Sequence, residues 1–450
     1  MLFIKWIFLG EQCPNIRGKV ATKDDVYSLL QLTYEMSDKL RMPNEYEHRS
    51  LFFRNIAFQQ FLYQIDFYYA HLSRQSILFS GLDKNHYIYK EFVKNTGLDV
   101  QDFLDLSLMT IVRFLDTNEP FLPESWFSTV EAKYSTSTVN CFLAAISKDI
   151  NDVRKILLGG DKGKRQACEN YELTPFIEFP LIKAHDKYIL THKNILFRRL
   201  EYFVYDIMRS IDAAKFMDKF GELFERYVEK SLEYSEVTFV TEKEIKKLLG
   251  IADNQIDFLI QDGTENIFVD AKAVEINSQG KTTHSTEILR DKTKQSILKA
   301  IAQAHDAIKK LLDSSNSSIS SSQNNYLLVI TFKDLYLGNG TNYYEVVAKD
   351  KIRDIYDKYK SYPCIPSENM HFITIDDLDI LTNIIKQKRY TFSEIIEVAK
   401  NNDKDPTTRM FDFGQHIQSL DHTPQTSDYL AVEKDGMFER IFEAVKIKTT

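Results

Sequence analysis

Two short apolar segments joined by a turn limit what this chain can fold into, because each holds a charged residue inside a hydrophobic run. Residues 256–260 read IDFLI and residues 268–273 read FVDAKA, and the turn sequence DGT lies between them at 262–264. Side chains two apart on a strand share a face, so Asp270 and Lys272 point the same way while their apolar neighbours face the other side. We therefore predict a hairpin that brings the acid of its first strand close to the acid of its second.

The charges on this hairpin require an explanation, because a charge buried in a sheet is unfavourable unless it is paired or binds a metal. The residues concerned are Asp257, Asp270 and Lys272. One interpretation is purely structural, with Lys272 in an ion pair with one of the two aspartates. The other is a metal site, and the hairpin sequence alone is compatible with both.

A helix predicted before the hairpin adds a third carboxylate. Segment 221–228, GELFERYV, has an apolar stripe that includes Phe224 and Val228. Steps of 100° per residue place Glu225 at the edge of that stripe and Glu222 on the solvated side. We expect Glu225 to lean over the sheet toward the two aspartates.

These three carboxylates and one ammonium are groups that suit phosphodiester hydrolysis. A hard cation such as Mg²⁺ polarises the phosphoryl group, helps to ionise water, and prefers oxygen ligands. We expect Asp257 and Asp270 to bind Mg²⁺ directly, with Mn²⁺ as a substitute and the Ala271 carbonyl as a backbone ligand. Glu225 would bind through water or a second ion. Lys272 would stabilise the negative charge that develops on the phosphorane oxygens.

With these motifs the chain resembles the PD-(D/E)xK, or restriction-endonuclease-like, nucleases. The matching motifs are G-x-x-F-E at 221–225, the single Asp257 in I-D-F-L-I, and D-A-K at 270–272, and Ile256 stands where the family name has proline. The resemblance covers about residues 216–332 and reaches 375 at most. It implies an α/β fold with an αβββαβ core and a central mixed sheet, and the activity of a Mg²⁺-dependent endonuclease.

The roles of further polar residues, on and before the helix that follows the D-A-K strand, are not decided by the sequence. The family often has a polar residue on this helix, and Lys294, Gln295 and Gln303 are the candidates here, each with a plain surface position as the alternative. His305 falls on an apolar helical stripe and is expected in the core rather than as a base. His284 lies in the preceding loop, where a solvated position is favoured over contact with a phosphate.

The chain is expected to divide near residue 200. Residues 1–200 alternate helical-looking stretches with loops and are predicted to form a largely helical N-terminal region that recognises a target or a protein partner. The nuclease domain is predicted at 201–385, and a C-terminal extension at 386–450. No residue cluster with catalytic spacing is found before residue 200.

Several local predictions follow from the periodicity of apolar residues. The first ten residues, MLFIKWIFLG, are interpreted as a buried strand, and residues 178–192 as a two-stranded element. Residues 326–332, 342–348 and 370–375 are predicted to be strands.

The charge and the cysteine content indicate which partners and which cellular compartment to expect. The formal net charge of -8 argues mildly against a protein that coats nucleic acid, although basic residues outnumber acidic ones between 281 and 310. No apolar run approaches the roughly 20 residues of a membrane span, so no membrane association is expected. The four cysteines lie far apart, which favours free thiols in the cytoplasm.

The function predicted from the sequence is a metal-dependent nuclease, with DNA favoured over RNA as the nucleic acid. By analogy with the family that the chain resembles, prokaryotic antiviral defence or restriction is the expected context. A homo-oligomer is left open. Two other functions also remain, namely a catalytically inactive nucleic-acid-binding module on the same fold and a scaffold that binds a protein partner.

Overall fold

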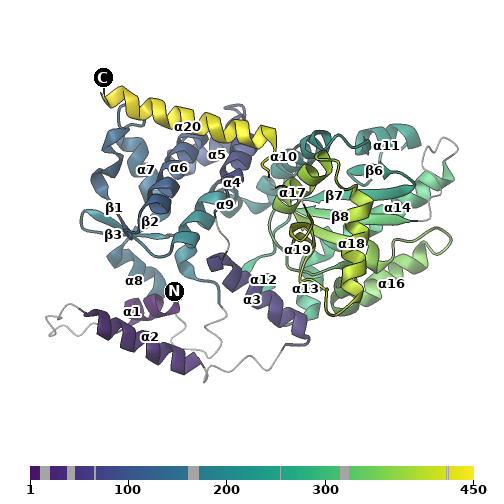
Figure 1. The fold of residues 1–450 in the computed structure, drawn as a ribbon, viewed down its shortest axis with the longest axis horizontal. Helices are drawn as coiled ribbons and strands as arrows, with labels where there is room; N and C mark the ends of the chain where they lie inside the picture. Colours follow the sequence, from purple (N-terminus) through teal and green to yellow (C-terminus); the bar gives the residue numbers. More distant parts are fainter. Residues whose placement is uncertain are drawn as a thin grey trace. The chain divides into compact units, whose positions relative to one another are not determined.

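The computed structural model describes residues 1–10, 21–37, 46–64, 67–160, 172–253, 255–314, 324–421, 423 and 425–449. The chain forms two compact units, drawn in Figure 1. Unit 1 comprises Met1–Tyr46, Asn55–Ile211 and Val432–Thr450, and unit 2 comprises Glu47–Arg54 and Asp212–Ala431. The expected C-terminal extension at 386–450 is thus divided between the two units, and a short segment of the expected N-terminal region belongs to unit 2.

Unit 1 is mostly helical and contains one four-stranded sheet. Its helices are α1 Leu2–Leu9, α2 Lys23–Ser37, α3 Arg49–Gln64 (which begins in unit 2), α4 Ala70–Gln75, η1 Ser76–Ser80, α5 Tyr87–Thr96, α6 Val100–Asp116, η2 Glu124–Thr129, α7 Thr136–Ile146, α8 Ile150–Gly160, η4 Pro175–Ile177, α9 Lys193–Ile211 and α20 Asp428–Thr449 (which begins in unit 2). The strands are β1 Phe121–Pro123, β2 Ser147–Asp149, β3 Leu181–Ala184 and β4 Lys187–Leu190, in the order β1-β4-β3-β2. The antiparallel β3–β4 pair confirms the two-stranded element predicted at 178–192.

The prediction of a buried strand at the start of the chain is wrong, because these residues form helix α1. Met1, Ile4 and Phe8 pack against a core cluster that includes Phe176. Their spacing of three and four residues is the helical one, which a strand interpretation of a short apolar run overlooks.

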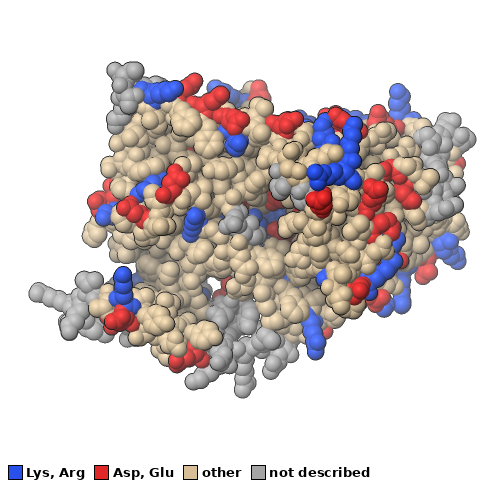
Figure 2. Space-filling view, viewed as in Figure 1, with Lys and Arg blue, Asp and Glu red and all other residues tan. Residues whose placement is uncertain are grey.

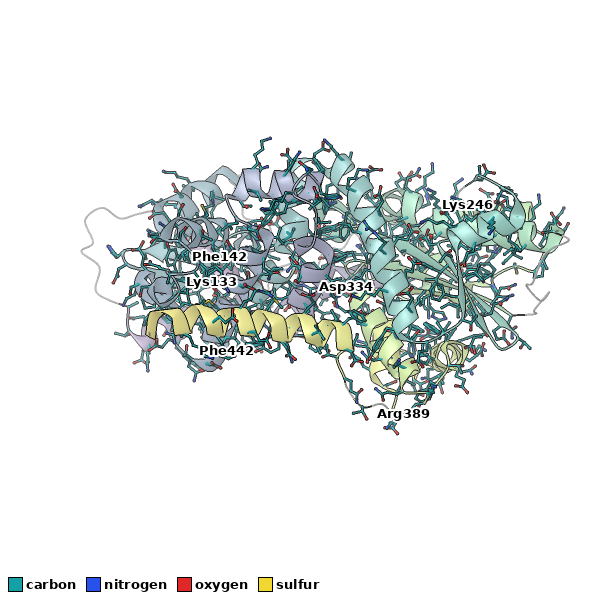
Figure 3. The ribbon with its side chains drawn as sticks, turned by 90° about the horizontal axis from the view of Figure 1, so that it is seen from above. Lys133, Phe142, Lys246, Asp334, Arg389 and Phe442 are labelled. Atoms are coloured by element: carbon teal, nitrogen blue, oxygen red, sulfur yellow. The ribbon has the colours of Figure 1, made fainter. Side chains whose placement is uncertain are left out.

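Helix α20 packs on unit 1 through its polar groups as well as its apolar ones. Figure 3 shows it as the long yellow helix, with Phe442 and the nearby Lys133 labelled. The Lys133 ammonium donates to the carbonyl of Arg440 at 2.8 Å. The Arg440 guanidinium in turn donates to the buried carboxylate of Asp105 at 3.0 Å. These contacts hold the end of the chain against helix α6.

Unit 2 is built on a five-stranded mixed sheet. Its strands are β5 Phe239–Thr241, β6 Phe258–Asp262, β7 Glu265–Lys272, β8 Asn325–Thr331 and β9 Met370–Thr374, in the order β5-β6-β7-β8-β9. The pairs β5–β6 and β6–β7 are antiparallel, and the pairs β7–β8 and β8–β9 are parallel. The strands predicted at 256–260, 268–273, 326–332 and 370–375 are therefore confirmed as β6, β7, β8 and β9.

Helices precede, interrupt and follow this sheet (Figure 1). They are α10 Ala213–Tyr234, α11 Glu242–Leu249, α12 Ser278–Lys281, α13 Thr286–Thr293, η5 Lys294–Leu298, α14 Lys299–Asp313, α15 Gly340–Asn342, η6 Tyr343–Ala348, α16 Lys349–Lys358, η7 Ser367–Asn369, α17 Ile375–Lys386, α18 Phe392–Lys404 and α19 Phe413–Gln418. Helix α10 contacts β7, α14 contacts β8, and α17 contacts both β8 and β9. The protein is thus a mixed α/β fold.

Two features of unit 2 differ from the predicted elements. The strand predicted at 342–348 is wrong, because Tyr343–Ala348 is helical and continues into α16. Tyr343, Val347 and Ala348 are its buried residues, a spacing that places them on one helical face. Helix α11 was not predicted, and it lies between the first two strands of the expected αβββαβ order. In the part of the chain that is described, no helix is long and apolar enough to span a membrane.

Candidate functional site

The β6–β7 hairpin brings two of the predicted acids together. Phe258 pairs with Val269 in the antiparallel register, so Asp257, directly before β6, lies opposite Asp270. The Asp257 carboxylate accepts a hydrogen bond from the backbone N–H of Ala271 at 2.7 Å. This bond fixes Asp257 beside the strand that carries the second acid.

Asp270 is fully buried and has very few polar contacts. Its Oδ2 atom lies 2.5 Å from the ammonium nitrogen of Lys272, whose side chain is 16% exposed. Neither carboxylate oxygen accepts a hydrogen bond of acceptable geometry from the described residues, so the contact with Lys272 is an ion pair by distance alone. Buried carboxylates normally accept several hydrogen bonds. Asp270 therefore has unused capacity to bind a cation.

Lys272 is held by a second residue, which answers the question left open on the helix after the strand. Its ammonium lies 3.4 Å from Oε1 of Gln303, on α14. The amide nitrogen of Gln303 donates to the carbonyl of Gln255 at 3.1 Å, which fixes the orientation of the amide. Lys294 and Gln295 are exposed. Of the three candidates, Gln303 is the one that contacts the site.

The environment of Asp257 disfavours its ionised form. Burial, followed by the negative charge of Asp270, raises the pKa of Asp257 well above its usual range, and Glu225 adds to the effect. The ammonium of Lys272 and the N–H of Ala271 oppose this rise without cancelling it. The site therefore disfavours the negative charge of Asp257 more than water does, and a bound cation would offset this penalty.

Glu225 lies near the aspartates without joining them as a direct third ligand. It is half-buried on α10, and burial, followed by the charges of Glu242 and Glu229, raises its pKa. Among the residues that the structure describes, no three His, Cys, Asp or Glu side chains are gathered as a metal-binding group. The structure thus places Asp257, Asp270 and Lys272 together, with Glu225 close enough for its charge to act on Asp257.

Helix α11 supports the site from the side of β6. The backbone N–H of Glu242 donates to the carbonyl of Asp257 at 2.7 Å. The Glu242 carboxylate accepts from the backbone N–H of Gln255 at 2.8 Å and pairs with Lys246 at 3.0 Å. Because both interactions act on residues 255–257, α11 fixes the backbone that carries Asp257. Figure 3 labels Lys246 on this helix.

The capping residues of α11 are a signal for a helix in the sequence, although its apolar periodicity is too short to indicate one. Thr241 and Glu244 form a capping box, in which the Thr241 side chain accepts from the Glu244 N–H and the Glu244 carboxylate accepts from the Thr241 N–H. Gly250 ends the helix in the left-handed conformation, with φ of 64°. This pair of signals brackets a helix of eight residues.

The two histidines have the positions expected of them. His305 is 1% exposed, and its ring contacts the carbonyl of Ile301 at 2.8 Å and accepts from the Ile365 N–H at 3.1 Å, so it is a core histidine. His284 is exposed in the loop before α13. Neither histidine has a described contact with Asp257, Asp270 or Lys272.

The donors present suit Mg²⁺. Two carboxylates from neighbouring strands provide the hard oxygen ligands that Mg²⁺ prefers, and an ion bound in this way keeps several waters. The unused oxygens of Asp270 and the uncompensated negative charge around Asp257 both favour binding of a cation. Residues 257 and 270–272 therefore fit a metal ion.

The surface gives weaker indications about a polyanionic substrate. Figure 2 shows acidic and basic side chains interspersed over the viewed face. In the basic stretch 281–310, Lys281 pairs with Glu275 at 2.6 Å and Lys310 with Asp306 at 2.7 Å. These lysines are therefore already partly neutralised.

Comparisons of the chain with protein-family models, with curated proteins and with solved structures found no match. The function of the site is therefore inferred from its geometry and chemistry.

Proposed function

We propose that unit 2 is a metal-dependent nuclease of the PD-(D/E)xK type. The observation that carries the proposal is a pair of neighbouring carboxylates with the ammonium of Lys272 beside them. Asp270 is buried on β7, and Asp257 is partly buried directly before β6. Two buried acids of the same charge destabilise a fold unless a proton or a cation lies between them. A cation site explains why both are present.

Each side chain has a distinct role in this proposal. Mg²⁺, when bound, polarises the phosphoryl group and makes a bound water easier to ionise. Asp257 and Asp270 would hold the ion together with the carbonyl of Ala271, and Glu225 would act through water or a second ion. Lys272 stabilises the negative charge that develops on the phosphate oxygens.

The order of elements in unit 2 supports this family. Helix α10, strands β5, β6 and β7, helix α14 and strand β8 occur in the αβββαβ order, with α11 inserted after β5 and with α12, α13 and η5 inserted before α14. Asp257 directly precedes β6 and Asp270 lies near the end of β7, which is where the family motifs were matched in the sequence. We assign α11 the role of a brace for the first of them.

DNA is proposed as the substrate in preference to RNA, in a prokaryotic defence or restriction setting. The N-terminal residues of unit 1 would recognise the target or a protein partner, because the described basic residues near the site are partly paired. Self-association would be one way to present two such sites to both strands of a duplex.

The test is cleavage by the purified full chain. Plasmid, linear and single-stranded DNA and RNA are each incubated with Mg²⁺, with Mn²⁺ and with a chelator, using wild-type protein and the Lys272→Ala variant. The expected result is metal-dependent cleavage of DNA by the wild type and a loss of about 10²-fold or more in the variant. Lys309→Ala, on the same helix as Gln303, is the matched control and should cleave normally.

A structural role for the Asp270–Lys272 pair is the competing interpretation, since their 2.5 Å contact is itself an ion pair. It predicts that Lys272→Ala lowers the thermal unfolding midpoint, and that neither Mg²⁺ nor Mn²⁺ produces heat in a calorimetric titration. If folded, metal-binding protein cleaves none of the four substrates, unit 2 is instead a catalytically inactive nucleic-acid-binding module.

A further inference from the structure

Unit 2 contains a second pocket that shares no lining residue with the candidate site. Its volume is about 680 Å³, and it is lined by the start of α3, by the loop after β8, and by the end of α18 and the segment that follows. Pockets of roughly 300–1,000 Å³ are typical of small-molecule sites. The volume is therefore sufficient for a ligand of nucleotide size.

Aromatic rings form part of the lining of this pocket. Tyr336 and Phe411 have ring centroids 5.9 Å apart, with planes at 42°. Phe53 also lines the pocket and is 56% exposed. Tyr336 and Phe411 are partly buried. Rings that line a cavity and keep part of their surface open offer stacking faces for a flat heteroaromatic group, and such stacking is tolerant of which base is bound.

The loop after β8 adds hydrogen-bonding groups and a close backbone approach. Gly338 lines the pocket with φ of 71°, and Tyr336 also has a positive φ, of 47°. The Asn339 side chain accepts from the backbone N–H of Asn342 at 2.9 Å, which fixes the turn. A side chain at position 338 would meet the amide of Asn342 at 3.2 Å, so glycine keeps the chain close to that residue.

Cations line the other part of the pocket. Lys404 and Arg409 are exposed, and no described residue forms an ion pair with either within 4 Å. The acid next to Lys404, Asp403, is already engaged, since its carboxylate accepts from Asn339 at 2.6 Å and contacts His416 at 2.9 Å. The Nε atom of Arg409 donates to the carbonyl of Asp403 at 2.9 Å, which leaves the terminal nitrogens of Arg409 and the ammonium of Lys404 to face an anion.

The remaining acids of the lining are compatible with such a ligand. Glu345 pairs with Lys349 at 2.5 Å. Glu368 lines the pocket and is exposed. A carboxylate in this position can accept hydrogen bonds from sugar hydroxyls, as acidic residues do in other nucleotide sites.

We propose that this pocket binds a nucleotide, with its base stacked on the rings of Tyr336, Phe411 and Phe53 and its phosphate on Lys404 and Arg409. The same chemistry is offered by a free nucleotide and by an unpaired nucleotide of a strand. The proposal does not rest on the nuclease site, because it involves none of the residues there and requires no metal.

The test is equilibrium binding to the full chain in the presence of a chelator, so that no cleavage occurs. The probes are AMP, GMP, CMP, UMP, adenosine, inorganic phosphate and a ten-nucleotide single-stranded DNA. Two variants are compared with wild type, Lys404→Gln/Arg409→Gln for the phosphate and Phe411→Leu for the base. Lys351→Gln/Lys358→Gln, at two exposed positions of α16 outside the pocket lining, is the matched charge control, and thermal unfolding checks the fold of each protein.

The expected result is saturable binding of at least one nucleotide or of the oligonucleotide, weakened about tenfold or more by Lys404→Gln/Arg409→Gln and unchanged in the control. Phe411→Leu should weaken adenosine and AMP alike. Binding of AMP identifies a free nucleotide, and binding of the oligonucleotide alone identifies a strand. The proposal is overturned if no probe binds, if phosphate binds as tightly as AMP, or if the Lys404 and Arg409 substitutions leave binding unchanged.

Discussion

Each unit of this protein buries an aspartate, and the two carboxylates differ in how many polar contacts they make with the protein. Asp105 of unit 1 and Asp270 of unit 2 are 1% and 0% exposed. Asp105 accepts hydrogen bonds from Tyr134 at 3.0 Å and from Arg440 at 3.0 Å, whereas Asp270 has one ion-pair contact, with Lys272. A buried acid with all its bonds made stabilises the fold, and one with unused oxygens points to a ligand.

The largest expected effect is on DNA cleavage, which should depend on Asp270 and not on Asp105. Asp270→Asn should lower the rate of DNA cleavage in Mg²⁺ by about 10²-fold or more, because a direct metal ligand is lost. Its thermal unfolding midpoint should change little, because the lost ion pair with Lys272 and the relieved repulsion from Asp257 oppose each other and the amide keeps the shape of the side chain. The exposed Asp253→Asn on the same unit is the control and should retain activity. If the Asp270→Asn protein is fully active, Asp270 is not a metal ligand required for cleavage, and it does not differ from Asp105 in function.

The next largest effect concerns Asp105 of unit 1, where we expect a loss of stability rather than of activity. Asp105→Ala leaves the Arg440 guanidinium and the Tyr134 hydroxyl without their acceptor, and it should lower the free energy of unfolding by about 2–3 kcal/mol. The figure lies below that of a fully buried pair because the Arg440 side chain is 32% exposed. Denaturant unfolding measures it. Cleavage by the folded protein should be unaffected, and a loss of activity without a loss of stability would contradict the structural role of Asp105.

A pH effect should distinguish Asp257 from an ordinary surface acid. Burial and Asp270 raise the pKa of Asp257, so the folded state holds its proton more tightly than the unfolded state does. This contribution to stability is present below the usual value of 3.8 and is lost as the pH rises through the raised pKa. Asp257→Asn removes that loss, and it should therefore raise the unfolding midpoint of the metal-free protein at neutral pH.

Metal provides the second half of that experiment. Mg²⁺ should raise the unfolding midpoint of the wild type, because a ligand that binds only the folded state stabilises that state. Asp257→Asn should lose most of this stabilisation. If Mg²⁺ stabilises the variant and the wild type equally, the ion binds elsewhere.

Sequence patterns predicted the sheet of unit 2 well and its supports poorly. Strands β6 to β9 are short apolar runs, so their positions could be read directly, as could the pairing that places Asp257 near Asp270. Helix α11 and the role of Glu242 were missed because the apolar pattern of α11 is short, and its capping box was the stronger signal. The apolar start of the chain was misread because strand and helix are ambiguous in a run of ten residues.

Contacts between residues far apart in the sequence set a different limit. Arg54 is 2% exposed, and its guanidinium donates to the carbonyls of Leu335, Gly280 and Lys281 at 2.9, 2.7 and 2.9 Å. This interaction places residues 47–54 in unit 2. No local pattern encodes it, because the acceptors are backbone groups more than 200 residues away.

The smallest expected effect tests Gln303, which contacts the reacting groups only through Lys272. Gln303→Ala removes the partner that orients the ammonium, and we expect kcat to fall about tenfold with little change in KM, since substrate binding does not depend on that contact. Gln303→Glu keeps an acceptor for Lys272 and loses only the donor to Gln255, so it should recover part of the rate. Gln295→Ala, at the exposed position that the sequence could not separate from Gln303, should be fully active. A fall in thermal stability that accounts for the whole loss of rate, or a change in KM alone, would show that Gln303 packs the helix rather than positions the lysine.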